Sequence, residues 1–371
     1  MKCISKRFST KIKKELIRID YKDLCNPNKD LTNIIHDSFG TEGLGCLVVK
    51  NIPGYLESRN KIMDYSAKIC ALKDPIEYMK QYEKPNIKRQ IGWSYGLSNP
   101  EKKKIGDILQ GAFNNRVLND TKINNPRDPN TEEEFRNVWP NEEKDPIFKG
   151  YKENFLNMGR HMYSLPLAAI HHLDKYLHHL DSKFNPHYLK NLMSSFDSQS
   201  TLMAYFPFNS LPEHIKEENR KNIDWISWHR DFSCLTSLAR AKHFTPDGKE
   251  YKTNGALLIK DRYGVEHECE YDDDEVALQI GDALYILSAG NLIATPHAVK
   301  TQQVPDDVMR AQYVSFFDPR PEQIIKPGNG ETINDVYNKD PTRGLHSMEE
   351  EYKAGLQYQD FIVKGVGNFF Q

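Results

Sequence analysis

The sequence predicts an α+β protein with a helical front half, an all-β back half and a helical end. Residues 152–181 carry apolar side chains at helical spacing and are expected to form a long core helix. From Leu202 to Pro319, short apolar runs recur with turns between them, a pattern typical of a β-sandwich or barrel. Residues 320–371 contain three prolines and the helical stretch "SMEEEYKAGLQYQDFIVKG".

The composition narrows the class of protein. A length of 371 residues allows one large domain or two of ordinary size, and 38% hydrophobic with 27% charged residues is typical of a globular chain. Its 50 basic and 52 acidic residues argue against nucleic-acid binding. Six scattered cysteines without a CxxC pair argue against a disulfide scaffold or zinc ribbon. No run approaches the roughly 18 apolar residues of a membrane span.

The chain divides into four expected regions. These are a basic leader or tail (1–16), a mostly helical region (17–190), a β-barrel (191–330) and a C-terminal helical extension (331–371). In the front half we expect a short strand in "LIRIDYKDL", a helix in "NKDLTNIIHDSFGTEG", a buried strand in "LGCLVVKNIPGY" and helix from about Ser58 to Glu83. The start "MKCISKRFSTKIKK" has no acidic residue before Glu15, which fits either a mitochondrial presequence or a solvated basic tail. We therefore expect a cytoplasmic or mitochondrial protein.

The segment "SWHRDFSCLTSLA" contains a candidate metal-binding pair. It reads as a strand, and residues two apart on a strand point to one face, so His229 and Asp231 can grip one ion. A third candidate, His297, ends a strand-like run 66 residues after Asp231. Two histidines and one carboxylate are the ligands of non-haem Fe(II) oxygenases, and no fourth ligand for a structural zinc site follows at fitting spacing. The plain alternative for His229 is a hydrogen-bonded histidine at a sheet end.

Arg310, on the strand after His297, favours the metal site over that alternative. A guanidinium offers a planar fork of donors to a carboxylate and stays charged inside a protein. An iron triad with a carboxylate clamp on the next strand is a site for a 2-oxo acid. A second cluster of histidines, at 171, 172, 178 and 179, forms two pairs two helical turns apart, too far to share one ion, and we expect a solvated helix face there.

These segments, taken in order, resemble the isopenicillin N synthase-like group of 2-oxoglutarate/Fe(II)-dependent dioxygenases. The matching pieces are "IRIDYKDL", "GTEGLGCLVVKNIPG", "GWSYG", "ILQGAFNN", "NVWPNE", "WHRDFSCLTSLA", "LQIGDALYILSAGNLIATPHAV" and "RAQYVSFFDP". The resemblance implies a double-stranded β-helix, a jelly-roll or cupin-like barrel, flanked by helices. It also implies that His229, Asp231 and His297 are the catalytic iron ligands and that Arg310 binds the C5 carboxylate of 2-oxoglutarate.

The chain departs from the family pattern at three positions near the cosubstrate. The serine of the family's RxS segment is Gln312 here, on the same strand face as Arg310, and its amide can donate to a carboxylate. The tyrosine that usually precedes proline on an early barrel strand corresponds to Phe206, which lacks the hydroxyl, and a neighbouring asparagine is Ala204.

The expected function is an oxidoreductase that uses Fe(II) and 2-oxoglutarate to hydroxylate or desaturate a small organic molecule. One alternative is a non-haem iron oxidase that needs no 2-oxoglutarate, in which Arg310 would clamp a substrate carboxylate. The other is a weakly active or inactive barrel that serves as a structural subunit of a larger assembly. The expected partners are a small-molecule substrate and, under the last alternative, the other subunits of a complex.

Overall fold

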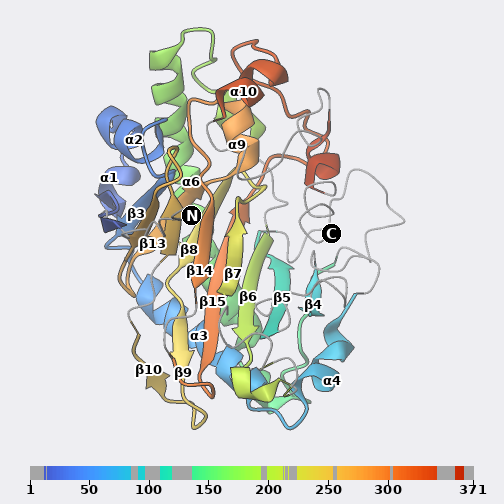
Figure 1. The fold of residues 1–371 in the computed structure, drawn as a ribbon. Helices are drawn as coiled ribbons and strands as arrows, with labels where there is room; N and C mark the ends of the chain where they lie inside the picture. Colours follow the sequence, from blue (N-terminus) through green and yellow to red (C-terminus); the bar gives the residue numbers. More distant parts are fainter. Residues whose placement is uncertain are drawn as a thin grey trace, which may run out of the picture.

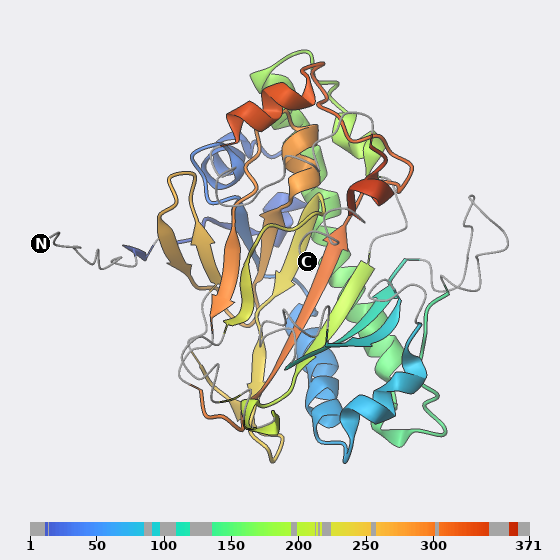
Figure 2. The same cartoon turned by 45° about the vertical axis from the view of Figure 1, so that its right-hand side comes forward.

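Two β-sheets lie face to face, and helices cover the outer face of the larger one (Figures 1 and 2). The computed structural model describes residues 12–13, 15–84, 91–96, 109–118, 136–193, 199–211, 213, 216, 224–253, 257–300, 304–340 and 356–362. Within these residues, strand pairing keeps the two sheets separate and does not close them into one barrel. The predicted helix-flanked jelly-roll class is confirmed in this open form.

The larger sheet draws strands from both halves of the chain. Its path runs β2-β3-β13-β8-β15-β6-β5-β4, with β9 paired to β15 and β10 paired to β9. The strands are β2 (Arg18–Asp20), β3 (Cys46–Lys50), β4 (Gly92–Tyr95), β5 (Gln110–Arg116), β6 (Gln199–Tyr205), β8 (Leu235–Ala239), β9 (Lys242–Phe244), β10 (Glu250–Tyr251), β13 (Val276–Ile280) and β15 (Met309–Phe317). The front half of the chain therefore builds both ends of this path.

The smaller sheet comes almost entirely from the back half of the chain. Its order is β1-β12-β11-β14-β7, and its pairs are antiparallel except β1 with β12. The strands are β1 (Ile12–Lys13), β7 (Asp224–His229), β11 (Leu257–Lys260), β12 (Glu266–Cys269) and β14 (His297–Lys300). Its β7–β14 edge carries two of the predicted metal ligands, His229 and His297.

Helices α3 and α6 pack on the outer face of the larger sheet, α3 against β6 and β15, and α6 against β8 and β15. The helices are α1 (Tyr21–Leu24), α2 (Thr32–Phe39), α3 (Tyr55–Cys70), α4 (Pro75–Met79), α6 (Tyr151–Leu180), α7 (Tyr188–Leu192), α9 (Asp282–Leu287) and α10 (Ile333–Lys339), with 3-10 turns η1 (Lys80–Tyr82), η4 (Pro146–Phe148) and η5 (Phe208–Ser210). Gly159 lets α6 pack closely against the end of β5, because a Cβ there would lie 2.1 Å from Cγ2 of Val117, the residue after that strand.

Alternation along the strands of the larger sheet separates two apolar cores. Side chains on one face of the sheet pack with the helices in an outer core. Side chains on the other face pack in an inner core between the two sheets. The inner core contains Leu16, Leu44, Cys46, Val48, Leu238, Leu257, Ile259, Cys269, Tyr271, Ala277 and Val314. Side chains that share this inner face line the space in which a site between the sheets must lie.

Two predicted strands are partly helical. In "IRIDYKDL" only Arg18–Asp20 are extended, and Tyr21–Leu24 form α1, in which the N–H of Lys22 donates to the Asp20 carboxylate. In "VALQIGDALYILSAG" the strand ends at Ile280, and Asp282–Leu287 form α9. All six residues of α9 are buried, so the segment shows no polar face that would mark it as helical in the sequence.

Several predictions fall wholly or partly outside the described residues. These are the basic start up to residue 11, residues 301–303 of the loop before β15, and most of the C-terminal helix, of which residues 358–362 are described and are helical. Among the described residues, no helix combines the length and the apolar character that crossing a membrane requires.

Candidate metal centre

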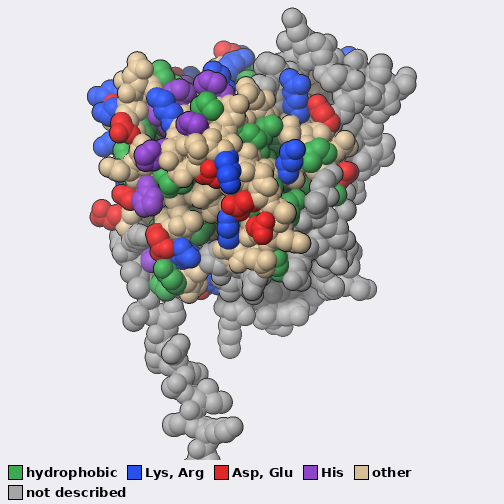
Figure 3. Space-filling model, turned by 90° about the horizontal axis from the view of Figure 1, so that it is seen from above, with side chains coloured by type: hydrophobic (Ala, Val, Ile, Leu, Met, Phe, Trp, Pro, Cys, Tyr) green, Lys and Arg blue, Asp and Glu red, His purple; other side chains and the backbone are tan. Residues whose placement is uncertain are grey.

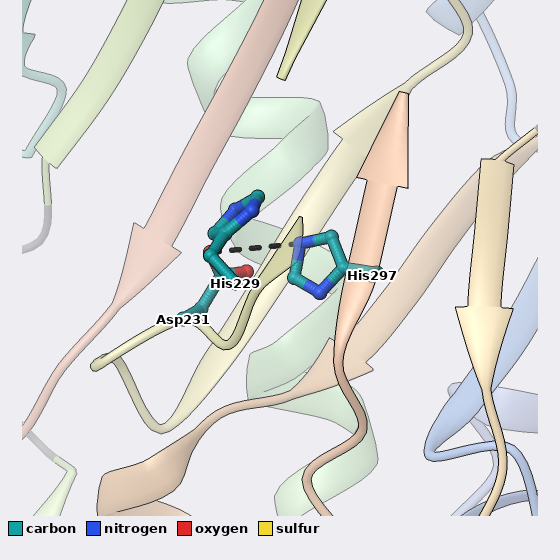
Figure 4. A group of neighbouring side chains, drawn as sticks. All are labelled: His229, Asp231 and His297. Atoms are coloured by element: carbon teal, nitrogen blue, oxygen red, sulfur yellow. Dashed lines mark ion pairs between the residues drawn. The ribbon is translucent and has the colours of Figure 1, made fainter. Parts of the chain in front are cut away.

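His229, Asp231 and His297 converge between the two sheets (Figure 4). Nε2 of His229 lies 3.5 Å from Oδ1 of Asp231, and Nε2 of His297 lies 3.8 Å from the same oxygen. One ligand atom from each residue lies within 4.8 Å of the other two, which is close enough to share an ion. Among the described residues this is the one group of three or more histidine, cysteine or acidic side chains with that spacing.

Backbone carbonyls fix the orientation of both imidazoles. Nδ1 of His229 lies 2.8 Å from the carbonyl of Ser227, and Nδ1 of His297 lies 3.3 Å from the carbonyl of Thr295. Since a carbonyl can only accept, each ring donates through Nδ1 and turns the Nε2 lone pair toward Asp231. Burial, together with the adjacent His229 ring, lowers the pKa of His297 to about 4, so this ring is neutral at pH 7. A neutral imidazole is the form that binds metal.

The Asp231 carboxylate is ionised, and one of its two oxygens makes no hydrogen bond among the described residues. Burial raises the pKa of Asp231, but the nearby His297 and His229 rings outweigh burial and hold it below its usual range. Its Oδ2 is buried and has no hydrogen-bond partner among the described residues. Such an atom in a native fold calls for a ligand, water or ion. Two imidazoles and a carboxylate therefore fit a divalent iron ion.

The expectation that His229 and Asp231 share one strand is wrong in detail. Strand β7 ends at His229, and Asp231 lies in the turn that leads to β8. The start of α9 holds this turn, because the N–H of Asp282 donates to the carbonyl of Asp231 at 2.7 Å. His297 likewise begins β14 rather than ending a strand, and its partner across the pair is His229. Pairing of β7 with β14 therefore brings the two imidazoles together.

Arg230, between His229 and Asp231 in the chain, connects this turn to two buried carboxylates. The sequence did not predict this role. The Nε of Arg230 donates to Asp282 at 2.5 Å and its Nη1 to Asp340 at 2.8 Å, and all three side chains are buried. Because Arg230 lies between the two candidate ligands in the chain, its bonds to Asp282 and Asp340 tie the turn that carries Asp231 to the start of α9 and the end of α10. Nothing in the sequence marks Asp282 and Asp340 as its partners.

Arg310 faces the interior between the sheets. It shares the inner face of β15 with Val314 of the inner core, and it is 2% exposed. Its Nη2 donates to Oε1 of Gln312, while Nη1 is buried without a hydrogen-bond partner among the described residues. Burial lowers the pKa of Arg310, but a guanidinium remains charged at neutral pH. A buried charge with an unused donor fits a carboxylate ligand.

Gln312 lies beside Arg310 on the inner face of β15. Its Oε1 accepts from Arg310, and its Nε2 donates to the carbonyl of Ala239 at 3.4 Å. Because an amide nitrogen carries two N–H groups, Gln312 orients the guanidinium through Oε1 and keeps one donor for a carboxylate. Tyr205, the residue before Phe206, pairs with Arg310 across the β6–β15 ladder, and its ring lies 4.6 Å from the guanidinium, while its hydroxyl donates to Sδ of Met203 at 3.5 Å.

Solved structures share this architecture along nearly the whole chain. A full-length Neurospora crassa protein in complex with alpha-KG is 17% identical, with a TM-score of 0.66 and 96% of each chain covered. A putative 2OG-Fe(II) oxygenase family protein of Caulobacter crescentus is 18% identical, with a TM-score of 0.65 and 95% of this chain and 99% of that chain covered. The chain has the fold of the 2-oxoglutarate/Fe(II) oxygenases.

A third relative extends the comparison to plants. The dioxygenase for auxin oxidation 1 of Arabidopsis thaliana, in a 2-oxoglutarate complex, is 17% identical, with a TM-score of 0.54 and 84% of this chain and 96% of that chain covered. No family model and no curated protein sequence matches the chain. The likeness to the oxygenase fold therefore lies in the structure, at sequence identities below 20%.

The C-terminal segment of the oxygenase fold, residues 356–362, covers the turn that carries Asp231. The ring of Phe361 packs edge-on against Phe232 with 6.1 Å between centroids. The hydroxyl of Tyr358 donates to Asp318 at 2.5 Å, and its backbone N–H donates to the carbonyl of Gln323. The segment is thus fastened both to the end of β15 and to the residue after the predicted metal ligand.

Histidine side chains also gather on the surface of the oxygenase fold in the view of Figure 3. On α6, ring nitrogens of His171, His172 and His178 bond to the backbone carbonyls of Pro27, Leu24 and Phe184. Within the described residues, these histidines form no group with metal-ligand spacing. His172 is 3% exposed, so the expected solvated helix face is wrong at this residue.

Gly281 in the oxygenase fold allows the close approach of α9 to the Asp231 turn. A Cβ at this position would lie 2.1 Å from the carbonyl oxygen of Ser233 and 2.9 Å from that of Asp231. We expect Gly281→Ala to lower the free energy of unfolding by about 1–3 kcal/mol and to weaken metal binding, measured by urea denaturation and metal titration. Gly264→Ala is the control for metal binding: its φ of +77° makes an alanine there strained too, but the methyl group meets nothing within 4 Å, so this variant should lose stability and keep its metal affinity. Equal metal affinity in the two variants would contradict the prediction.

Proposed function

We propose that this protein is a 2-oxoglutarate- and Fe(II)-dependent dioxygenase that couples decarboxylation of the oxo acid to hydroxylation or desaturation of a small organic substrate. The observation that carries the proposal is the pairing of two unsatisfied charged groups, Asp231 in the His–Asp–His group and Arg310 on the facing sheet. An ion fits the first group and a carboxylate fits the second. The order of sequence motifs supports the isopenicillin N synthase-like group within these oxygenases.

The relatives support both the cosubstrate and the class of substrate. The Neurospora crassa protein and the auxin dioxygenase were solved with alpha-KG or 2-oxoglutarate, and the former also with thymine. These ligands are small molecules, and a small organic substrate is the corresponding proposal for this chain.

Each residue has a defined part in this scheme. His229, Asp231 and His297 hold Fe(II) through two Nε2 atoms and one carboxylate oxygen. Arg310 binds the distal carboxylate of the oxo acid, and Gln312 holds the guanidinium in place. Bound iron supplies oxygen activation, and the oxo acid supplies two electrons as it becomes succinate and carbon dioxide. The inner core keeps bulk water away from the charged groups, which strengthens their hold on both ligands.

The first test is anaerobic binding of Fe(II) and 2-oxoglutarate, followed by the weak visible absorption of the metal-to-ligand complex. We expect the band in the wild type and its loss in Asp231→Ala, which removes an iron ligand. In Arg310→Ala we expect iron to bind while 2-oxoglutarate affinity falls roughly 10- to 100-fold, the value of one or two charge-assisted hydrogen bonds. Arg320→Ala, exposed just beyond β15, is the matched control and should keep the band.

The same titration separates the alternatives. Iron binding without the band in the wild type would favour the oxidase that needs no oxo acid. No iron binding at all would leave a structural barrel. Succinate release that requires 2-oxoglutarate, and that Asp231→Ala abolishes, would complete the case for the dioxygenase.

A further inference from the structure

Gln279 on β13 is a buried amide that the fold leaves unsatisfied. Its side chain is 1% exposed, and neither Oε1 nor Nε2 has a hydrogen-bond partner among the described residues. Burying an amide without partners is unfavourable, and such groups in native folds are often explained by function or by an ordered water. The position lies in the segment that supplies Gly281, but the sequence pattern does not distinguish it from a core residue.

Strand alternation directs Gln279 toward the space between the sheets. Its neighbours Leu278 and Ile280 belong to the outer core, whereas Ala277, two residues away, belongs to the inner core. The residues opposite Gln279 are Thr236 on β8 and Cys46 on β3. Cys46 also belongs to the inner core, and directly opposite residues have Cβ atoms about 4.5–5.5 Å apart on one face.

On the β8 side, Gln279 lies opposite Thr236, which is close to Asp231. The Thr236 hydroxyl bonds to that of Ser233 at 2.9 Å, and it lies close enough to Asp231 to help lower the pKa of that carboxylate. Gly281, two residues after Gln279, packs directly on the carbonyl of Asp231.

On the β3 side, Gln279 lies opposite Cys46, next to the residues that contact Thr295 before His297. The N–H of Ile280 donates to the carbonyl of Gly45, the residue before Cys46. A Cβ on Gly45 would lie 3.1 Å from the Thr295 hydroxyl, and that hydroxyl donates to the carbonyl of Leu44 at 2.7 Å. The carbonyl of Thr295 in turn orients His297. The amide therefore lies between the elements that hold two of the three ligands.

We propose that Gln279 is a positioning residue that hydrogen-bonds an oxygen ligand, a water molecule in the absence of the oxo acid, on the metal held by the His–Asp–His group. The inference rests on the proposed function. A water bound to a cation is a strong hydrogen-bond donor with two protons. Oδ2 of Asp231 and Oε1 of Gln279 are two buried acceptors without partners among the described residues near this centre. Together they would fix the orientation of that water.

Mn(II) is the probe for the test, because it takes the same oxygen and nitrogen ligands and its bound water is measured by proton relaxation of the solvent. Gln279→Met keeps the length of the side chain and removes the amide. We expect the metal-free variant to melt no lower than the wild type, since no protein partner is lost. Its Mn(II) affinity should fall by about 10- to 100-fold, as for other residues that support metal ligands, and the relaxation effect per bound ion should change.

Gln199→Met is the matched control. Gln199 donates to Oδ1 of Asn114 at 3.1 Å, so this variant should lose stability and keep its Mn(II) affinity. If Gln279→Met instead lowers the melting temperature of the metal-free protein and leaves Mn(II) affinity unchanged, the amide is structural and the inference is wrong. If the wild type binds no Mn(II), the proposed function fails with it, whereas unchanged affinity in the variant alone overturns only the role of Gln279.

Discussion

Arg230→Ala is expected to lower the free energy of unfolding by about 3–5 kcal/mol and to abolish metal binding. The substitution leaves Asp282 and Asp340 buried without the cation that neutralises them, and the cost of an uncompensated buried charge exceeds that of the lost contacts. It also removes the bonds that tie the turn carrying Asp231 to α9 and α10. Urea denaturation measures the first effect, and Fe(II) titration measures the second.

Two further variants sharpen this test. Arg262→Ala removes a pair with Glu42 at the surface and should cost no more than about 1 kcal/mol. A triple variant, Arg230→Met with Asp282→Leu and Asp340→Leu, removes all three charges and should recover much of the lost stability. Metal binding should remain weak in the triple variant, because the bonds that tie the turn to α9 and α10 are still missing. Full metal affinity in Arg230→Ala would show that the turn is held by its backbone contacts alone.

Phe361→Ala is expected to undock the C-terminal segment from the turn that carries Asp231. Phe361 is 1% exposed, and deletion of a buried phenylalanine side chain costs about 3–5 kcal/mol where the cavity cannot collapse. Because residues 356–362 form a short separate element, much of this cost appears as local opening. Hydrogen exchange should therefore rise in residues 356–362 and in the turn after His229, and Fe(II) affinity should fall.

Leu180→Ala is the control for Phe361→Ala. Leu180 is 47% exposed at the end of α6, and its truncation should change neither stability nor exchange near Asp231. Faster exchange confined to residues 356–362, with the turn and metal affinity unaffected, would mean that the segment only covers the turn and does not hold it.

The three candidate metal ligands could be named from the sequence because their residue types and spacing are local features. His229 and Asp231 are two residues apart, His297 lies within a strand-like run, and Arg310 on the next strand favoured the metal site. Their supports were not predictable from the sequence. Arg230 finds Asp282 and Asp340 only through the fold, and the latter lies 110 residues away. Gln279 reads as one polar residue within an apolar run, and only strand order reveals that it faces the centre.

Some elements of secondary structure could likewise be predicted from the sequence, and others could not. Strands with alternating or branched apolar residues, such as β8 and β15, were expected near their observed places. Helix α9 was not, since burial on every side removes the periodicity that identifies a helix. The contacts of Gln312 were not predictable either, because the sequence shows that its amide can donate but not that it lies between Arg310 and the carbonyl of Ala239.

Arg230 and Phe232 both contact residues that are synthesised much later, Asp340 and Phe361, so the surroundings of the candidate centre are completed late in synthesis. On the ribosome, His229, Asp231 and His297 emerge before Asp340 and Phe361. Until those later residues are released, a nascent chain carries all three ligands but neither the second carboxylate of the Arg230 anchor nor the aromatic cover of the turn. Chains that stop before Asp340 therefore carry the three candidate ligands without the second carboxylate partner of Arg230.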